Sequence, residues 1–135
     1  MRYSELTVGQ TAEYARQITD REIKAFAEIT GDFNPVHLDE EAAAKTRFGG
    51  RIAHGMLSAG LISAAIATTL PGPGSIYLAQ TMRFTAPVRI DDTVTVTLTV
   101  TELLSKNRLK LSTVCRNQHG DMVLDGEATI LMEQD

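Results

Sequence analysis

The stretch "TVTVTLTVT", Thr93 to Thr101, decides the fold, because threonine alternates with an aliphatic residue along its whole length. The aliphatic members occupy every second position: Val94, Val96, Leu98 and Val100. A period of two places them on one face of an extended strand, with the threonines on the other. A long strand with one dry face and one polar face is typical of an antiparallel sheet that covers a core on one side.

Three further segments around this strand are also predicted to be extended. "SIYLAQTMRF" (Ser75–Phe84) precedes it, and "RLKLSTVCRN" (108–117) and "MVLDGEATILM" (Met122–Met132) follow it, with a turn through "QHGD" between the last two. All three are bounded by turn-forming residues. From residue 75 onward the sequence therefore predicts an antiparallel meander of long strands.

The segment before the strands, "IAHGMLSAGLISAAIATTL" (52–70), is apolar and rich in small residues. Its length is close to that of a membrane-spanning helix, but its alanines, serines and threonines favour close packing on a sheet over contact with lipid. The following "LPGPG" (70–74) cannot continue a helix. Together with a short N-terminal strand and small helices, this predicts an α+β architecture in which one long buried helix is wrapped by an antiparallel β-sheet.

The small helices are marked by capping residues. Thr19 and Glu22 have the spacing of a capping box, and Gly31 provides a C-terminal stop about three turns later. Asp39 can cap a second short helix through "EEAAAKT". The polar stretch between these two helices is consequently held on a short, fixed loop.

Length and composition limit the functional classes. We expect the 135 residues to form one domain, residues 1–135. The net charge of −4, without a basic run, argues against nucleic-acid binding. A lone cysteine, Cys115, in an alternating segment is most simply a small buried hydrophobe, and it suits a reducing compartment. The N-terminus lacks an apolar run of signal-peptide length, so we expect a cytoplasmic protein that does not enter a membrane.

The loop between the helices, "TGDFNPVHLDEE" (30–41), gathers Asp32, Asn34 and His37 around a proline. An Asp and a His that share one water could move its protons in both directions, and the Asn amide could orient either of them. The alternative is structural, namely an Asx turn at Asp32 and the start of a helix at His37. Spacing alone leaves both interpretations open.

A second polar constellation is "RIAHGML" (51–57), at the start of the long helix. Gly55 in the first turn would leave backbone N–H groups facing developing negative charge, although it could equally serve close packing on the sheet. Ser63, two turns on, could bond back to its own helix or face a substrate. His54 is interpreted as a partly buried polar residue, and His119, in the "QHGD" turn, as a solvated one.

Metal and serine-nucleophile chemistry have little support in the sequence. The spacing of the Cys, His, Asp and Glu residues gives no ligand cluster, so no metal site is predicted. A nucleophile elbow of the Gly-x-Ser-x-Gly type is also missing from the sequence. The Asp32 and His37 pair is therefore the main candidate for acid and base chemistry.

Taken together, "GDFNPVHLDEEAA", "RIAHGML" and "SIYLAQTMRFTAPVRIDDTVTV" resemble the hydratase motif of the MaoC-like, (R)-specific enoyl-CoA hydratases, over nearly the whole chain and in order. The resemblance implies a hot-dog fold and reversible addition of water to a trans-2-enoyl-CoA, giving the (R)-3-hydroxyacyl-CoA, without metal or redox cofactor. By the same resemblance, Asp32 and His37 hold the water and the Gly55 N–H stabilises the enolate. Asn34 supports the loop, and Ser63 lies near the aspartate.

The resemblance also implies a homodimer whose two sheets join into one, with an acyl-CoA as the bound substrate. Ile66 and Ile130 are then candidates for the far wall of the acyl pocket, and their bulk favours short acyl groups. The basic residues of "SKNRLK" (105–110) and Arg83 could hold the nucleotide end, or could simply be solvated.

Two other functional classes stay open. A thioesterase or an acyl-carrier-protein dehydratase shares the fold, and a non-catalytic acyl-CoA-binding module would need neither Asp32 nor His37. The hydratase product would feed either fatty-acid breakdown or polyhydroxyalkanoate monomer supply.

Overall fold

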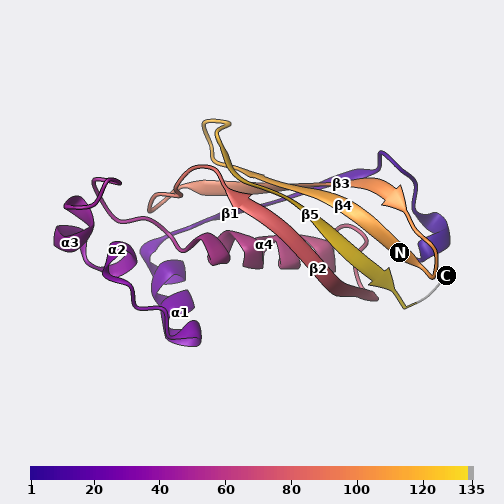
Figure 1. The fold of residues 1–135 in the computed structure, drawn as a ribbon, viewed down its shortest axis with the longest axis horizontal. Coiled ribbons are helices and arrows are strands. Elements are labelled where there is room, and N and C mark those ends of the chain that lie inside the picture. Colours follow the sequence, from indigo (N-terminus) through magenta and orange to yellow (C-terminus); the bar gives the residue numbers. More distant parts are fainter. Residues whose placement is uncertain (134–135) are drawn as a thin grey trace.

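A computed structural model describes residues 1–133, and in that part of the chain five strands form one antiparallel sheet that curves around a long helix (Figure 1). The strand order is β1-β3-β4-β5-β2. The strands are β1 (Thr11–Gln17), β2 (Ser75–Phe84), β3 (Thr93–Leu103), β4 (Arg108–Arg116) and β5 (Met122–Met132). The predicted α+β architecture, with a long helix wrapped by an antiparallel sheet, is confirmed.

The alternating stretch forms the middle of β3 and behaves as its period predicts. Its aliphatic side chains are fully buried in the core, whereas its threonines are at least partly accessible. β3 pairs with β1 on one side and with β4 on the other, so it lies inside the sheet. The buried face packs against the helix, and the polar face covers the outside of the sheet.

The prediction of a simple meander holds for β3, β4 and β5 but is wrong for β2. β2 pairs with β5 at the edge of the sheet and does not contact β3 as a neighbour. The reason lies in the connection after β2, which runs back past the start of the long helix: the Ala53 N–H donates to the Val88 carbonyl at 2.8 Å, and Ile52 forms an isolated bridge with Arg89. The chain therefore enters β3 beside β1.

The long helix is α4 (Gly55–Thr68), which is shorter than the apolar segment 52–70 because His54 acts as its N-cap residue. One side of α4 is buried against the sheet through Leu61, Ile62, Ala65 and Ile66. Within residues 1–133, none of the helices has the length and apolar character needed to cross a membrane. The segment is a core helix, as its small residues predict.

Three short helices gather at the N-terminal end of α4, away from the chain termini (Figure 1). They are α1 (Asp20–Thr30), α2 (Pro35–Leu38) and α3 (Glu40–Ala44); a single 3₁₀ turn, η1 (Tyr3–Glu5), lies near the N-terminus. This cluster positions the polar loop against the start of α4.

The capping predictions are confirmed at two of three positions. Gly31 ends α1 with a left-handed φ of 82°, and the Asp39 carboxylate caps α3 by accepting from the Ala42 N–H at 3.2 Å. Thr19 is the N-cap residue of α1, but the predicted capping box does not form. Its hydroxyl donates to the Glu22 carboxylate, so it does not accept a bond from a helix N–H.

Candidate active site

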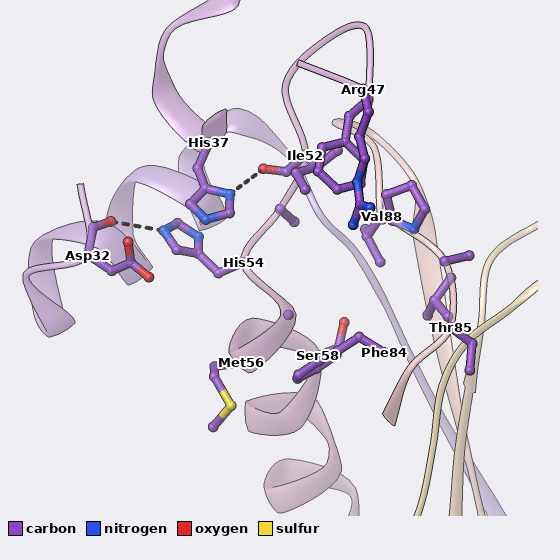
Figure 2. A pocket seen from close by; sticks show the side chains of 16 residues that line it. Asp32, His37, Arg47, Ile52, His54, Met56, Ser58, Phe84, Thr85 and Val88 are labelled. Atoms are coloured by element: carbon purple, nitrogen blue, oxygen red, sulfur yellow. Dashed lines mark hydrogen bonds between the residues drawn. The ribbon is translucent and has the colours of Figure 1, made fainter. Parts of the chain in front are cut away.

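A cavity of about 490 Å³ opens at the N-terminal end of α4 (Figure 2). It lies between the loop after α1, the segment that leads into α4 and the chain that follows β2. Asp32, His37 and Gly55 all line it, although they come from three different parts of the sequence. The fold therefore brings the two polar constellations of the sequence to one pocket.

His37 is held firmly on α2. Its side chain is 8% exposed, and its Nδ1 lies 2.8 Å from the Ile52 carbonyl (Figure 2). A carbonyl only accepts hydrogen bonds, so Nδ1 carries a hydrogen, and in the neutral form of the ring Nε2 would be the nitrogen with the lone pair. The Arg51 guanidinium adds a second constraint by donating from Nε to the His37 carbonyl at 2.6 Å. Two contacts to neighbouring segments therefore fix the position of His37 at the pocket.

Asp32 is held more loosely, in the turn after Gly31. Its carboxylate is exposed and accepts from the Asn34 N–H at 3.3 Å, which is an Asx turn. Asn34 in turn caps α2, accepting from the Val36 N–H at 3.3 Å, and Pro35 occupies the favoured first helical position. The predicted Asx turn at Asp32 is confirmed, but the helix begins at Pro35 and not at His37. Neither feature conflicts with the chemical interpretation.

The Asp32 and His37 groups also meet across the pocket. A carboxylate oxygen of Asp32 and a ring nitrogen of His37 lie within 4.8 Å of each other. One water that donates about 2.8 Å hydrogen bonds to two acceptors spans about 4.5 Å between them, given its bent geometry. A separation of up to 4.8 Å leaves room for both groups to contact the same water molecule.

His54 is a site residue that the sequence interpretation missed. It is buried rather than partly exposed (2%), and its Nε2 donates to the backbone carbonyl of Asp32 at 3.0 Å (Figure 2). Its ring centroid lies 3.9 Å from that of His37 and 4.7 Å from that of Phe26. Burial lowers the pKa of His54, which favours the neutral ring. Only its position directly before Gly55 could have suggested a role.

Asp32, His37 and His54 also form a group whose potential ligand atoms all lie within 4.8 Å of one another, which the sequence spacing did not reveal. The two imidazole rings are stacked with an angle of 30° between their planes. The close contact of the two rings brings His54 beside the Asp32 and His37 pair.

Gly55 is the first residue of α4, so its N–H is one of the four that lack a partner within the helix. It lines the pocket at the positive end of the helix dipole. A Cβ at this position would lie 2.7 Å from Cε1 of Phe84, at the end of β2. Both interpretations of this glycine, as a donor and as a site of close packing, fit the structure.

The remaining sequence candidates lie apart from the pocket. Ser63 is exposed on the outer side of α4, and Ile66 and Ile130 are core residues. None of the three lines the cavity in this single chain, so their roles stay predictions. Ser58, one turn after Gly55, is the buried helix serine that does line it.

The charged groups near the site have distinct roles. Arg51 links the His37 carbonyl to α1, because it also donates to Asp20 Oδ1 at 2.6 Å. Hydrogen bonds from Lys24 and then from Arg51 lower the pKa of Asp20. Of the lysines and arginines in residues 1–133, Arg47 alone lines the pocket, a role that its sequence context did not indicate. Burial raises the pKa of Cys115 to about 12, which agrees with its interpretation as an inert core residue.

The strand order and the helix enclosed by the sheet define a hot-dog fold, and the pocket at the helix N-terminus adds an Asp and His pair to it. The sequence profile described as "MaoC like domain" matches residues 5–120. The chain belongs to this family of MaoC-like dehydratases.

Individual relatives agree with the family over nearly the full length. The (R)-specific enoyl-CoA hydratase of Rhodospirillum rubrum is 45% identical, covering 96% of this chain and 90% of that protein. The solved structure of the R-hydratase PhaJ1 from Pseudomonas aeruginosa is 56% identical, with a TM-score of 0.94 over 99% of this chain and 86% of that one. The (R)-hydratase from A. caviae involved in PHA biosynthesis is 42% identical, with a TM-score of 0.91 over 95% of this chain and 98% of that one.

Proposed function

We propose that this protein is an (R)-specific enoyl-CoA hydratase that adds water reversibly to a trans-2-enoyl-CoA and forms the (R)-3-hydroxyacyl-CoA. The observation that carries the proposal is the Asp32 and His37 pair, with potential acceptor atoms within 4.8 Å of each other, in a pocket at the start of α4. The hydratase relatives, at 42–56% identity over nearly the whole chain, support the same reaction and its stereochemistry.

The proposed reaction begins with a water that donates one hydrogen to Asp32 and the other to Nε2 of His37. Nε2 is the available base because Nδ1 already donates to the Ile52 carbonyl. As the water oxygen bonds to C3 of the enoyl group, His37 takes one proton, and the electron pair of the double bond moves toward the thioester oxygen. Acid and base assistance of this kind contributes about 10² to 10⁴ in rate.

The resulting enolate oxygen needs a donor, and the N–H of Gly55 is positioned for this role at the positive end of α4. His37 then returns its proton to C2, so that one water is added in total and no proton or electron is left over. Because the chemistry balances without an oxidant or a Lewis acid, we propose that turnover needs no metal or redox cofactor.

The CoA portion of the substrate is expected to reach solvent past Arg47. The guanidinium of Arg47 lies 5.1 Å from the centroid of the Phe48 ring, so both a cation and an aromatic face stand at the pocket. Of the other basic candidates, Lys110 forms an ion pair with Glu127, with Nζ 3.5 Å from Oε1. None of residues 105–110 lines this cavity. Arg47 is therefore our first choice for contact with a CoA phosphate.

A homodimer is part of the proposal. β2 is an edge strand that exposes large apolar side chains, among them Ile76, Tyr77 and Leu78. The outer side of α4 exposes small residues, including Gly60 and Ser63. An uncovered edge of this kind favours pairing with another strand, and edge-to-edge pairing of β2 would join two sheets into one. Light scattering coupled to gel filtration would report the mass of the particle in solution.

We also place the protein in the cytoplasm, which the buried free thiol of Cys115 supports. The hydratase product would supply polyhydroxyalkanoate monomers or belong to fatty-acid breakdown. The name of the A. caviae relative, which is involved in PHA biosynthesis, favours the first role.

The test is to follow the near-ultraviolet absorbance of the conjugated thioester of crotonyl-CoA on adding the purified protein. We expect the absorbance to fall, with the (R)-3-hydroxy thioester as the product. Asp32→Asn and His37→Gln should each lower kcat by about 10² to 10⁴, whereas His119→Gln, in an exposed turn, should not.

A chelator should leave the rate unchanged, because no step passes through a metal ion. Persistent absorbance with short and medium enoyl-CoAs would contradict the hydratase assignment. A matching acyl-carrier-protein thioester, tried in parallel, would reveal a dehydratase that prefers that carrier.

A further inference from the structure

We propose that His54 is a positioning residue that fixes Asp32 and His37 relative to each other, and that the two histidines donate to their backbone carbonyls from opposite ring nitrogens. The inference rests on the proposed function for the meaning of Asp32 and His37, but its structural part stands independently. Its basis is the set of contacts that the His54 ring makes with the Asp32 carbonyl and the His37 ring, both shown in Figure 2, and with the ring of Phe26.

The first step concerns Asp32, which needs an external constraint. Its carboxylate is exposed and its one hydrogen bond, from the Asn34 N–H, is long at 3.3 Å. The bond from His54 Nε2 to the Asp32 carbonyl, at 3.0 Å, ties the same residue to the N-cap position of α4 across 22 positions in sequence. His54 therefore holds Asp32, the less constrained member of the pair, to the start of α4.

The second step concerns His37, whose ring packs against the same anchor. With ring centroids 3.9 Å apart, His54 covers one face of His37, and Phe26 of α1 packs against His54 at 4.7 Å. The backbone of Asp32 and the ring of His37 thus share one buried support. Since a misplacement of about 1 Å can cost about 10² in rate, this shared support has a direct effect on turnover.

The third step concerns protonation. Both histidines donate to backbone carbonyls, His37 through Nδ1 and His54 through Nε2, so their hydrogens lie on different ring nitrogens. Nδ1 of His54 is buried and lacks a partner within residues 1–133. Adding a proton there would bury an unpaired cationic donor, and burial accordingly lowers the pKa of His54. His54 therefore favours its neutral form, which adds no positive charge beside the ring of His37.

The experiment separates the two contacts with two variants. His54→Gln keeps an N–H donor but removes the ring, and His54→Phe keeps the ring but removes the donor. Each should lower kcat for crotonyl-CoA about tenfold to hundredfold, with KM changed by less than about threefold. His119→Gln serves as the matched control and should behave as wild type. Thermal unfolding of each variant establishes that it is folded.

Nitrogen-15 NMR of the histidine rings provides a readout that does not depend on turnover. We expect the hydrogen of His54 on Nε2 and that of His37 on Nδ1, with the signals assigned by their loss in His54→Gln and His37→Gln. A His54 hydrogen on Nδ1, or wild-type kcat in either folded His54 variant, would overturn the inference. If the wild type itself lacks hydratase activity, the proposed function fails, and the NMR result alone decides on His54.

Discussion

The two ends of α4 are built in opposite ways. The N-terminal end, with His54 and Gly55, faces a pocket and is surrounded by short helices that polar contacts hold in place. The other half, with Ile62 and Ile66, is enclosed by the sheet and held by apolar packing. The pocket and the buried apolar contacts of α4 therefore lie in different halves of this helix. Substitutions at the two ends should separate rate from stability.

The largest effect is expected at the apolar end. Ile62→Ala should lower the free energy of unfolding by about 2 to 5 kcal/mol, since it leaves a cavity in the packed core. Denaturant unfolding measures the change, and kcat of the folded fraction should stay within about threefold of wild type. Ile29→Ala, at an 86% exposed position of α1, is the matched control and should change stability by less than about 0.5 kcal/mol. A large loss of kcat in folded Ile62→Ala would contradict the separation.

At the polar end, Gly55→Ala should lower kcat about tenfold to hundredfold and hardly change stability. The new methyl would lie 2.7 Å from the Phe84 ring, so the ring must move. Because Phe84 is 53% exposed, it can move at little cost in stability. Because Phe84 also lines the pocket, its movement changes the geometry there and lowers kcat. Steady-state kinetics and thermal unfolding measure both quantities.

The double variant Gly55→Ala with Phe84→Leu tests this cause, because the smaller side chain removes the contact. Relative to Phe84→Leu alone, the added alanine should then have a smaller effect on kcat. Equal effects in both backgrounds would mean that the clash with Phe84 is not responsible.

A smaller effect is expected at the mouth of the pocket. Arg47→Ala should raise KM for an enoyl-CoA about twofold to fivefold with kcat unchanged, because an exposed ion pair with a phosphate contributes little more than that. Lys110→Ala, on β4 and paired with Glu127, is the control and should leave KM unchanged. If Lys110→Ala raised KM and Arg47→Ala did not, the CoA contact would lie on the outside of the sheet and not at the pocket.

The smallest effect concerns Asp20, whose pKa is lowered from 3.8 by Lys24 and then Arg51. Because the folded pKa is depressed, its stabilising contribution is present above pH 3.8 and is lost as the pH falls through the folded value. Asp20→Asn should therefore melt slightly below wild type near neutral pH, and the difference should vanish well below pH 3.8. Thermal unfolding across this range measures it. A difference that grows in acid would contradict the assigned sign.

Much of the fold could be predicted because its determinants are local. The period of two in β3, the small residues of α4 and the left-handed Gly31 each act within a few residues of themselves. The position of β2 could not be predicted, since it depends on how residues 85–92 pass the start of α4. In general, strand order is set by contacts far apart in sequence.

The same distinction applies to the candidate site. Asp32 and His37 lie five positions apart, and their pairing was visible in the sequence. His54 is 22 positions from Asp32, and its contact with that carbonyl exists only after α1, α2 and α4 have come together. Arg47 and Ser58 likewise acquire their place at the pocket from the fold, because nothing in their local sequence sets them apart.

Arg51 makes enzymatic activity a sensitive probe of native structure. A single guanidinium holds both the His37 carbonyl and the Asp20 carboxylate at the start of α1. If α1 detaches, this brace is lost while the hydrogen-bonded sheet can persist. On gentle heating or in dilute denaturant, inactivation should therefore precede the loss of β-sheet circular dichroism, so an activity assay detects early opening of the helical layer that a spectrum of the sheet does not register.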